Sequence, residues 1–294
     1  MEISNTNLFT YVKAGLVTII LSLAAVFQAC AEQERGRSDT LCNSERHNVL
    51  PSITQNQVLR VGTTGDYTPF SYFSKDGNKE LVGVDIVMAK DLAQFMGVEL
   101  NLVKTSWPTL MEDLLADKFD IAMSGVSITS ARKQHALFSL PVHKSGKVPI
   151  TRDENVFKYQ TIDDINQPEV RVIVNKGGTN EVFSRKHFSK AQLTVSQENL
   201  SVFQKIVDGQ ADLMVTDRVE TLVQQAIHPE LSAVNPDTPL NSFNKGYMMV
   251  CDPDFKMRVD EWVTARKKDG TMETVFNREL EQIINSAHNA IQGE

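Results

Sequence analysis

Short apolar runs rich in β-branched residues alternate with amphipathic segments from residue 58 almost to the end of the chain. The runs end in glycine or polar residues, as strands do, and the segments between them carry apolar residues at helical spacing. The expected strands are Val58–Thr63, Val98–Lys104, Asp120–Met123, Arg171–Val174, Leu193–Ser196, Asp212–Val215 and Tyr247–Val250. The expected helices are Val84–Met96, Leu110–Asp117, Asn180–His187, Leu200–Asp208, Arg218–Ala226, Pro253–Lys268 and Thr271–Ala287. This alternation predicts an α/β fold whose parallel sheets are covered by helices on both faces.

Polar residues and glycines follow the carboxyl ends of several expected strands. They are Thr64-Gly65-Asp66, Ser106-Trp107, Ser124-Gly125, Gly177-Gly178-Thr179 and Thr216-Asp217. Ligands of open α/β sheets bind outside these strand ends, so we expect a binding cleft here. Taken singly, many of these residues are also what an ordinary polar loop contains.

The segment from Ser124 to Arg132, SGVSITSAR, has the features of an anion site. Gly125 lets a ligand approach the backbone, and the N–H and hydroxyl groups after it can bind an anion. Arg132 would add a two-pronged bond to a carboxylate. The alternative interpretation is that Ser130 caps a helix and Arg132 is solvated.

Asp217 directly follows the apolar run LMVT and places an acid at a strand end. A ligand's ammonium group could bind there. Equally, Asp217 could be the N-cap of the helix that follows, and the residues alone leave both interpretations open.

Composition and spacing exclude several classes of function. A chain of 294 residues that is 41% hydrophobic can bury one large core or two lobes. Its net charge of −7 argues against nucleic acid, which attracts basic surfaces. The six histidines and three cysteines lack zinc-ligand spacing, and neither a GxxxxGK[ST] loop nor a GxSxG elbow occurs. We therefore expect no metal, no cofactor and no nucleic-acid partner.

The N-terminal region has the features of an export signal. Lys13 precedes the apolar run Ala14–Ala29, which is shorter than the roughly 20 residues of a membrane span. Ala29 and Ala31 are small residues at the −3 and −1 positions of a cleavage site. Residues 1–31 are therefore expected to be removed, leaving the mature protein in the periplasm.

The cysteines allow further interpretations of this region. Cys30 could be acylated in a lipoprotein, but Phe27-Gln28-Ala29 is a poor match to the residues usual before such a cysteine. After cleavage, Cys42 and Cys251 could form a disulfide in an oxidising compartment, or both could stay unpaired. Cys42 lies in a polar leader, residues 32–57, whose first half we expect to be flexible.

Several stretches resemble the periplasmic amino-acid-binding proteins of ABC transporters. They are VLRVGTTGDYTPFSYF, DIAMSGVSITSARKQHALFSLPV and the turn at Gly178-Thr179. That family has two α/β lobes joined by two crossovers. The resemblance therefore implies a two-lobed, type II periplasmic-binding-protein fold with its ligand cleft between the lobes. It also implies that Arg132 holds a ligand's α-carboxylate and Asp217 its α-ammonium group.

The likeness is closer to a catalytic offshoot of that family, the cyclohexadienyl dehydratases. The similar stretches are TTGDYTPFSY, TSWPTLM, FDIAMSGVSI, SGKVPIT, IVNKGGTNEVF, FQKIVDGQADLMVTD and HPELSAVNP, which together span about residues 58–287. Trp107, Lys147 and the pair Asn180-Glu181 are the more specific part, because plain binding proteins usually carry other residues there.

The resemblance implies a lyase of aromatic amino acid biosynthesis. These dehydratases convert prephenate to phenylpyruvate and L-arogenate to L-phenylalanine, and both substrates lose water and CO₂ to form an aromatic ring. The departing hydroxyl needs a general acid, and the resemblance assigns that role to Glu181. A carboxylate in a helix's first turn is stabilised as the anion, so burial and the substrate's charges would have to raise its pKa. The alternative interpretation of Glu181 is an ordinary helix-start carboxylate.

The substrate's two carboxylates imply the other site residues. Arg132 with Ser127 and Thr129 would hold the side-chain carboxylate. Lys147 and Asn175 would face the ring carboxylate, which must leave as CO₂. The remaining expected substrate-binding residues are Asp66, Tyr67, Trp107, Ser124, Thr179, Asn180 and Asp217. Of these, the aromatic pair would wall the ring, or could simply pack in the core.

The two-lobe prediction divides the chain after the leader. Residues 58–146 and 245–287 would form a discontinuous first lobe, residues 147–244 the second lobe, and residues 288–294 a tail. Closure of the lobes would exclude water and bring the anion site against Glu181. The partner would then be a small-molecule substrate. The alternative function is a non-catalytic amino-acid-binding protein that delivers its ligand to an ABC permease.

Overall fold

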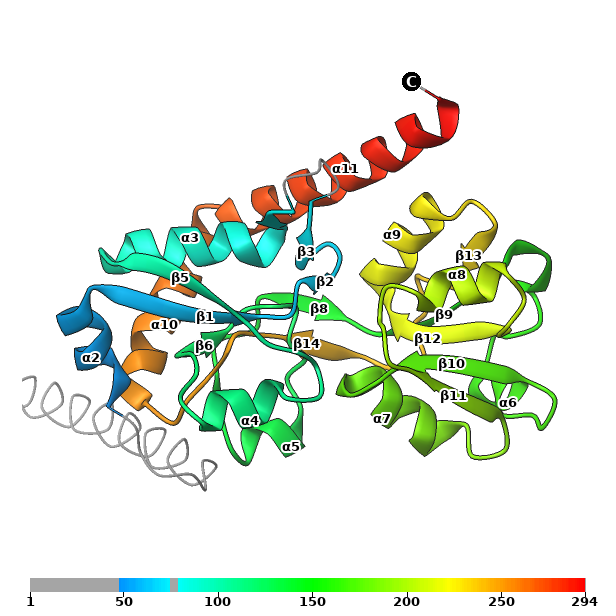
Figure 1. Cartoon of the computed structure of the whole chain (residues 1–294), viewed down its shortest axis with the longest axis horizontal. Helices are drawn as coiled ribbons and strands as arrows, with labels where there is room; N and C mark the ends of the chain where they lie inside the picture. Colours follow the sequence, from blue (N-terminus) through cyan, green and yellow to red (C-terminus); the bar gives the residue numbers. More distant parts are fainter. Residues whose placement is uncertain (1–47, 75–78, 294) are drawn as a thin grey trace, which may run out of the picture.

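The computed structural model of the chain describes residues 48–74 and 79–293. Within them the chain forms two lobes that lie side by side and are joined by extended segments (Figure 1). The expected export signal, Cys30, Cys42 and most of the polar leader lie outside the described residues. Cys251 is disulfide-bonded, and its partner lies outside them as well.

The first lobe is built on a mixed sheet. Its strands are β1 (Val58–Thr63), β5 (Glu99–Lys104), β6 (Ile121–Ala122), β7 (Leu137–Phe138) and β15 (Met248–Met249), in the order β5-β1-β6-β15-β7. A small antiparallel sheet beside it consists of β2 (Asp66–Tyr67), β3 (Ser71–Phe73) and β4 (Leu81–Val82). The cleft residues of this lobe follow β1, β5 and β6, at the carboxyl edge of the main sheet.

Helices cover both faces of this sheet, with α3 and α4 on opposite sides (Figure 1). The helices of this lobe are α3 (Val84–Met96), α4 (Leu110–Leu115), α5 (Ser130–Lys133) and α10 (Pro253–Lys268). α3 buries Met88 and Leu92 in the core of the lobe. It ends at Gly97, whose φ of 72° is the left-handed conformation that commonly terminates a helix.

The last residues of the polar leader form a helix that the sequence analysis did not expect, α2 (Val49–Asn56). Asp252 explains its position. One oxygen of this carboxylate accepts backbone N–H groups at the start of α2, and the other accepts those at the start of α10. A single buried side chain therefore satisfies free N–H groups of two helices.

The second lobe is a second mixed sheet with helices on both faces (Figure 1). Its strands are β9 (Lys147–Arg152), β10 (Arg171–Asn175), β11 (Gln192–Ser196), β12 (Leu213–Asp217) and β13 (Leu231–Ala233), in the order β11-β10-β12-β9-β13. Its helices are α6 (Ile162–Ile165), α7 (Gly178–His187), α8 (Val202–Val207), α9 (Arg218–Ile227) and the 3₁₀ turn η1 (Asp153–Asn155). Along β10, Val172 and Val174 pack in the core that holds Phe183 of α7, and Ile173 packs in the core that holds Phe203 of α8. This alternation explains why the strand reads as a continuous apolar run.

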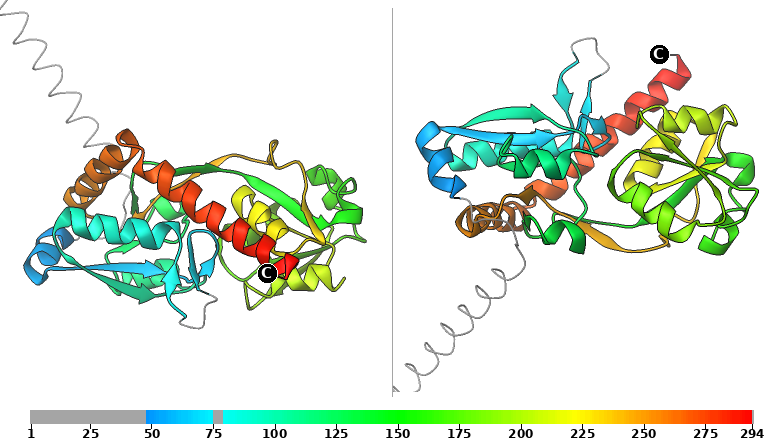
Figure 2. Two further views of the ribbon diagram at one scale, coloured as in Figure 1. Left: turned by 90° about the horizontal axis from the view of Figure 1, so that it is seen from above. Right: turned by 60° about the horizontal axis from the view of Figure 1, so that its bottom comes forward.

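Two antiparallel strands, β8 (His143–Ser145) and β14 (Phe243–Lys245), carry the chain between the lobes. The C-terminal helix α11 (Thr271–Gln292) begins on the first lobe and extends across to α9 of the second (Figure 2). Val219 of α9 belongs to the core of the first lobe. The lobes are therefore packed against each other, beyond their covalent connections.

Two expectations about the sheets were wrong. The sheets are mixed rather than parallel, because β9 and β15 each enter a lobe from a crossover and run antiparallel to their neighbours. In addition, β9 was not expected as a strand. It contains Pro149, which lacks an N–H group and argues against a central strand, yet β9 is paired on both sides.

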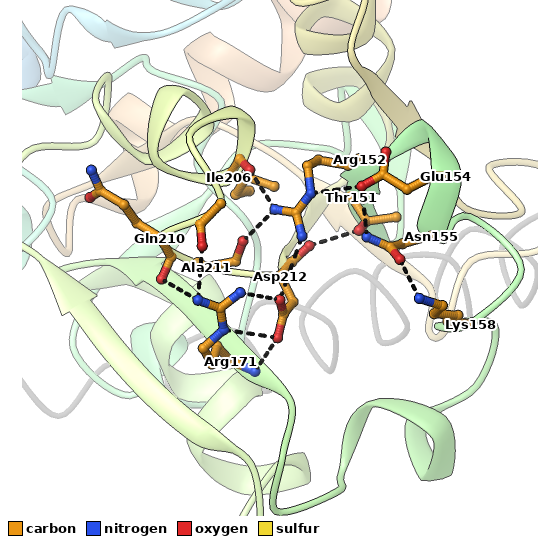
Figure 3. Close-up of polar contacts among 11 residues, drawn as sticks. Thr151, Arg152, Glu154, Asn155, Lys158, Arg171, Ile206, Gln210, Ala211 and Asp212 are labelled. Carbon is orange, nitrogen blue, oxygen red and sulfur yellow. Dashed lines mark hydrogen bonds and ion pairs between the residues drawn. The ribbon is translucent and has the colours of Figure 1, made fainter.

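Both lobes carry the same arginine–aspartate pair at the edge of the sheet opposite the cleft. In the first lobe, Asp120 accepts the backbone N–H of Arg60 (2.8 Å) and its guanidinium (2.6 Å). In the second lobe, Asp212 accepts the backbone N–H of Arg171 (2.8 Å) and its guanidinium (2.6 Å). Figure 3 shows that Arg171 and Arg152 also donate to backbone oxygens around the end of α8. Asp212 thus joins β10 to β12, and the two arginines beside it bind the end of α8.

We expect Asp212→Asn to lower the free energy of unfolding at neutral pH by roughly 1–3 kcal/mol, because charge-assisted hydrogen bonds are lost. Burial would raise the pKa of Asp212, but the bonds from Arg171 outweigh it and hold the pKa below its usual range. The ionised Asp212 therefore stabilises the folded protein above the ordinary aspartate pKa. This stabilisation is lost as the pH falls through the lower pKa that Asp212 has in the folded protein. The difference from the unmodified protein should therefore shrink on acidification.

Urea unfolding at several pH values measures this prediction. The control is Asp237→Asn, which removes an exposed partner of Arg218 (89% exposed) and should change little. Equal effects of the two substitutions would contradict the structural role of Asp212.

Candidate functional site

A cavity lies between the lobes, at the carboxyl ends of strands from both sheets. The first lobe contributes Tyr67, Trp107, Gly125, Ser127 and Arg132, and the second Asn175, Gly178, Thr179, Asn180, Asn199, Asp217 and Glu220. Its free volume is about 20 Å³, which holds a water molecule but not a six-membered ring. A substrate of that size can therefore enter only when the lobes separate.

Direct contacts hold the lobes together around this cavity. The Tyr67 hydroxyl donates to Asp217 Oδ2 (2.5 Å), and Asn199 Nδ2 donates to the backbone oxygen of Asp66 (2.9 Å). Gly177, in the turn before α7, lies so close to the first lobe that a Cβ atom there would be 2.8 Å from the backbone nitrogen of Pro108. The structure is therefore that of the closed form.

Arg132 presents a cation to the cavity. Thr129 caps α5 by accepting the Arg132 N–H (3.2 Å), and Arg132 Nη1 donates to the backbone oxygen of Ser127 (2.9 Å). Burial lowers the pKa of Arg132 to about 10, against the charge of Asp217, so the guanidinium stays positive at neutral pH. The ion pairs between described residues leave Arg132 without a carboxylate partner, and it is free to bind one.

Asp217 is bound by two lysines as well as by Tyr67. Its Oδ1 accepts from Lys147 Nζ (2.6 Å) and its Oδ2 from Lys245 Nζ (2.6 Å). All four residues are at most 4% exposed. Burial would raise the pKa of Asp217, but the two ammonium groups hold it well below its usual range. Asp217 is the N-cap residue of α9, as the alternative interpretation expected, but its side chain makes no capping bond to the helix.

Glu220, in the first turn of α9, places a buried carboxyl group at the cavity. It is 3% exposed, and its Oε2 accepts a hydrogen bond from Thr216. Burial raises the pKa of Glu220 to about 8. The hydrogen bond from Thr216 and the charges of the lysines lower this pKa, and the negative charge of Asp217 raises it further. Glu220 is therefore mainly protonated at neutral pH, and a neutral carboxylic acid can donate a proton.

A chain of hydrogen bonds links Lys147 to Glu220. Lys147 Nζ donates to Thr179 Oγ1 (3.1 Å) and to Asn180 Oδ1. Asn180 Nδ2 in turn donates to Asn175 Oδ1 (3.2 Å) and to Thr216 Oγ1 (2.9 Å). Because the Thr216 hydroxyl then donates to Glu220, the orientation of this carboxyl group is fixed by the second lobe.

Glu181 has a different environment from Glu220. Its Oε2 accepts the backbone N–H of Gly177 (2.8 Å), and its Oε1 accepts from Arg185 Nε (2.8 Å). The Gly177 N–H and the Arg185 guanidinium lower the pKa of Glu181, although its partial burial acts in the opposite direction. Glu181 is not among the residues that line the cavity. Its role as general acid stays a prediction, and its geometry is that of a helix-start carboxylate.

Two other expected residues support the site from behind. Asp66 Oδ1 accepts from Trp107 Nε1 (3.0 Å), and Trp107 meets the Tyr67 ring edge-on, with the ring centroids 5.7 Å apart. Ser124 is fully buried, and its hydroxyl bonds to those of Thr64 (2.8 Å) and Ser71 (2.7 Å). Asp66 thus orients an aromatic wall, and Ser124 fixes the loop after β6.

The structure brings most of the expected site residues together. Those that line the cavity are Tyr67, Trp107, Ser127, Arg132, Asn175, Thr179, Asn180 and Asp217. Those that do not are Asp66, Ser124, Thr129, Lys147 and Glu181. Sequence reasoning missed Asn199, Glu220 and, behind Asp217, Lys245. The sequence did contain a signal for Glu220. It lies three residues after Asp217, and residues at this spacing lie on the same face of a helix, so Glu220 could be expected to face the same cavity.

No metal centre or membrane helix is evident in the part of the chain that the structure describes. Residues 48–74 and 79–293 contain no group of three histidine, cysteine or acidic side chains placed to hold a metal ion. None of the helices described there is both long and apolar enough to cross a membrane.

The chain matches known proteins over most of its length. It is 45% identical over 239 residues to the cyclohexadienyl dehydratase of Pseudomonas aeruginosa, covering 81% of this chain and 88% of that protein. Among solved structures, the ancestral amino-acid-binding protein AncCDT-1, described as a precursor of cyclohexadienyl dehydratase, is 33% identical with a TM-score of 0.74 and covers 79% of this chain and all of its own. A variant of an ancestral cyclohexadienyl dehydratase, AncCDT-3, is 46% identical with a TM-score of 0.50 and covers 81% of this chain and 98% of its own.

These likenesses confirm the expected two-lobed, binding-protein fold and the resemblance to the dehydratases. The model of the bacterial extracellular solute-binding proteins, family 3, matches residues 59–282. This range includes every residue that lines the cavity and, except for Val58 at the start of β1, both five-stranded sheets. The chain therefore belongs to the bacterial extracellular solute-binding proteins, family 3.

Proposed function

We propose that this protein is a cyclohexadienyl dehydratase that converts prephenate to phenylpyruvate, and arogenate to phenylalanine, by loss of water and CO₂. The 45% identity to the P. aeruginosa dehydratase supports the activity. The observation that carries the proposal is the buried Glu220 carboxyl, with its pKa raised to about 8. It lies at a cavity that also holds Arg132, which has no carboxylate partner among the described residues. A binding protein needs an anion site, but it has no use for a proton donor.

The reaction requires a proton at one end of the ring and release of CO₂ at the other. The C–O bond to the ring hydroxyl breaks, and a proton from the general acid converts the departing hydroxide into water. The bond from the ring to its carboxylate breaks as well, and the electron pair of that bond becomes part of the aromatic ring. The catalytic carboxylate then regains a proton from solvent when the lobes open.

We assign the general acid to Glu220 rather than to Glu181. Glu220 is protonated at neutral pH, lines the cavity and is held in place by Thr216. The pKa of Glu181 is lowered, and its carboxylate is already bound by Gly177 and Arg185. A general acid works best when its pKa lies near the working pH, and Glu220 meets that condition.

The remaining residues would position the substrate. Arg132, with Ser127 beside it, would bind the side-chain carboxylate. The opposite wall, formed by Asn175 and the lysine-bound Asp217, would face the ring carboxylate, and the weak net charge there would suit a group that must leave as neutral CO₂. Trp107 would wall the ring.

The proposal predicts that the purified protein forms phenylpyruvate from prephenate without added metal or nucleotide. Phenylpyruvate formation over time is the measurement. The alternative function, binding of an amino acid for an ABC permease, draws on the likeness to the amino-acid-binding AncCDT-1. No phenylpyruvate, together with tight binding of an amino acid that is recovered unchanged, would favour that alternative.

We also propose that the protein acts in the periplasm after cleavage of the export signal behind Ala31. The family is described as extracellular, and the apolar run at residues 14–29 fits a signal that is removed. Acylation at Cys30 is the less favoured form of export.

A further inference from the structure

Asn199 brings a buried oxygen without a hydrogen-bond partner to the cavity. Its Oδ1 is buried and accepts no hydrogen bond from any residue that the structure describes. The side chain lines the cavity between the lobes. A buried acceptor that stays unpaired costs free energy, and the large majority of buried polar groups in proteins have a partner. At a binding site, such an atom indicates that a ligand supplies the missing donor.

The opposite lobe fixes the orientation of the Asn199 amide. Nδ2 donates to the backbone oxygen of Asp66 at 2.9 Å. A carbonyl oxygen can only accept, so the amide nitrogen must face Asp66 and the amide oxygen must face away from it. Because Asp66 and Asn199 lie in different lobes, this bond forms when the lobes close. Closure therefore leaves Oδ1 as the end of the amide that can bind a ligand.

The main chain around Asn199 is held by its own lobe. Asn199 lies between β11 and α8. Next to it, the hydroxyl groups of Ser196 and Ser201 both donate to the backbone oxygen of Glu198 (3.0 and 3.1 Å). Glu220 belongs to the same lobe, in the first turn of α9. Opening of the lobes therefore admits a substrate without separating Asn199 from Glu220.

The other amide and aspartate oxygens that line the cavity accept hydrogen bonds from the protein itself. Asn175 Oδ1 accepts from Asn180, and Asn180 Oδ1 accepts from Lys147. Both oxygens of Asp217 accept from lysine ammonium groups. Among these oxygens, Asn199 Oδ1 is the one left to accept from a hydroxyl group of a ligand.

We propose that Asn199 Oδ1 accepts the hydrogen of the substrate's ring hydroxyl while Glu220 gives a proton to the oxygen of that hydroxyl, which makes Asn199 a further catalytic residue. The proposal rests on the dehydratase function proposed above. The C–O bond breaks, its electron pair stays on the oxygen, and the proton from Glu220 completes a water molecule. The hydroxyl keeps its own hydrogen throughout, so no proton passes to Asn199. As the oxygen gains a proton its hydrogens become more positive, and the bond to Asn199 strengthens in the transition state.

Two aromatic 2-oxo acids that differ in one hydroxyl group test the proposal without turnover. 4-Hydroxyphenylpyruvate carries a hydroxyl at the ring position from which prephenate loses its own, and phenylpyruvate carries none. We expect calorimetry to show that the unmodified protein binds 4-hydroxyphenylpyruvate about tenfold more tightly, because phenylpyruvate leaves the buried Oδ1 unpaired. Leucine resembles asparagine in shape but has no polar atom, so Asn199→Leu should remove this preference. Equal binding by the unmodified protein, including no measurable binding of either acid, or a preference kept in Asn199→Leu, would overturn the proposal.

Kinetics with prephenate separates a role in catalysis from a role in closing the lobes. Asn199→Leu should lower kcat by about tenfold, because the departing hydroxyl loses its acceptor. Asn199→Asp keeps an oxygen acceptor but cannot donate to Asp66, so it should lower kcat far less. Its KM should rise, because the added negative charge repels the substrate's carboxylates.

The two folded variants also show which proposal fails. An equal loss of kcat in both would mean that Asn199 acts through its bond to Asp66, and would overturn the role of Oδ1. If prephenate is not turned over by the unmodified protein, but a preference for the hydroxylated acid is lost in Asn199→Leu, the hydroxyl-binding role of Asn199 stands and only the dehydratase function fails.

Discussion

Replacing Glu220 with glutamine should lower kcat for prephenate by about 10²–10⁴-fold, the range that general acid catalysis by one side chain contributes. Glutamine keeps the size of the side chain and an oxygen that can accept from Thr216, but it has no acidic proton to give. The substrate's carboxylates bind elsewhere, so KM should change little. A loss confined to kcat is what removal of a transition-state interaction produces.

The matched control is Glu181→Gln, the same change at the other glutamate in the first turn of a cleft helix. We expect near-native turnover and a loss of no more than about 1 kcal/mol in stability from the missing first-turn charge. Circular dichroism of both variants shows whether they are folded. The reverse result, with turnover lost in Glu181→Gln and kept in Glu220→Gln, would return the role of general acid to Glu181.

The pH dependence of the unmodified enzyme gives a second measurement of the same assignment. The profile of kcat/KM reports pKa values of the free enzyme. With Glu220 as the acid, kcat/KM should fall as the pH rises through about 8, because the carboxyl loses its proton there. The pKa of Glu181 is lowered. With Glu181 as the acid, kcat/KM would therefore already fall at a pH below the ordinary pKa of glutamate.

These two glutamates show where sequence reasoning reaches its limit in the site. Both lie in the first turn of a helix that follows a strand of the second sheet, so helix electrostatics predicts the same low pKa for each. The difference is tertiary: Glu181 accepts the N–H of Gly177 at the start of its own helix, whereas Glu220 is buried at the cavity and accepts from Thr216. Lys245 was missed for a related reason, because a lysine in a polar crossover is usually solvated, and here aromatic rings from the first lobe and the crossover cover it.

The fold followed from the sequence most closely where residues that begin or end helices, such as Gly97 and Pro253, mark the bounds of a segment. The expected range of β1 agrees with the structure, as do those of α3 and α10. The antiparallel strands were the weak point, because β15 is short and β9 contains Pro149. The direction of β9 and β15 is set by the segments that cross between the lobes. The path of these segments produces no periodic pattern of apolar residues, so the sequence does not reveal it.

The closed form depends on a glycine that the sequence marked as a turn. Gly177 has a φ of 73° and lies against Pro108 of the opposite lobe. The neighbouring Gly178 lies against Trp107, at distances that a Cβ atom would tolerate. Gly177 is thus the point at which an added side chain would hold the lobes apart.

We expect Gly177→Ala to lower kcat/KM for prephenate by about 10²-fold, because an error of about 1 Å in the position of catalytic groups has that effect. The new Cβ atom would lie 2.8 Å from a backbone nitrogen of Pro108, which cannot move aside as a flexible side chain could. The Tyr67–Asp217 contact and the water-excluding closure around Glu220 would then be incomplete. Small-angle scattering with phenylpyruvate bound would show the variant to be more open than the unmodified protein.

Gly209→Ala is the matched control for this substitution. Gly209 lies in the same lobe with a φ of 71°, and nothing lies within 4 Å of the position of a Cβ atom there. Both variants lose about 1 kcal/mol of stability to a left-handed alanine, so their thermal stabilities should be similar, and only Gly177→Ala should lose activity. If both variants turned over prephenate at the native rate, the lobes would not need to approach as closely as Gly177 and Pro108 do here, and the proton transfer from Glu220 would not depend on closure.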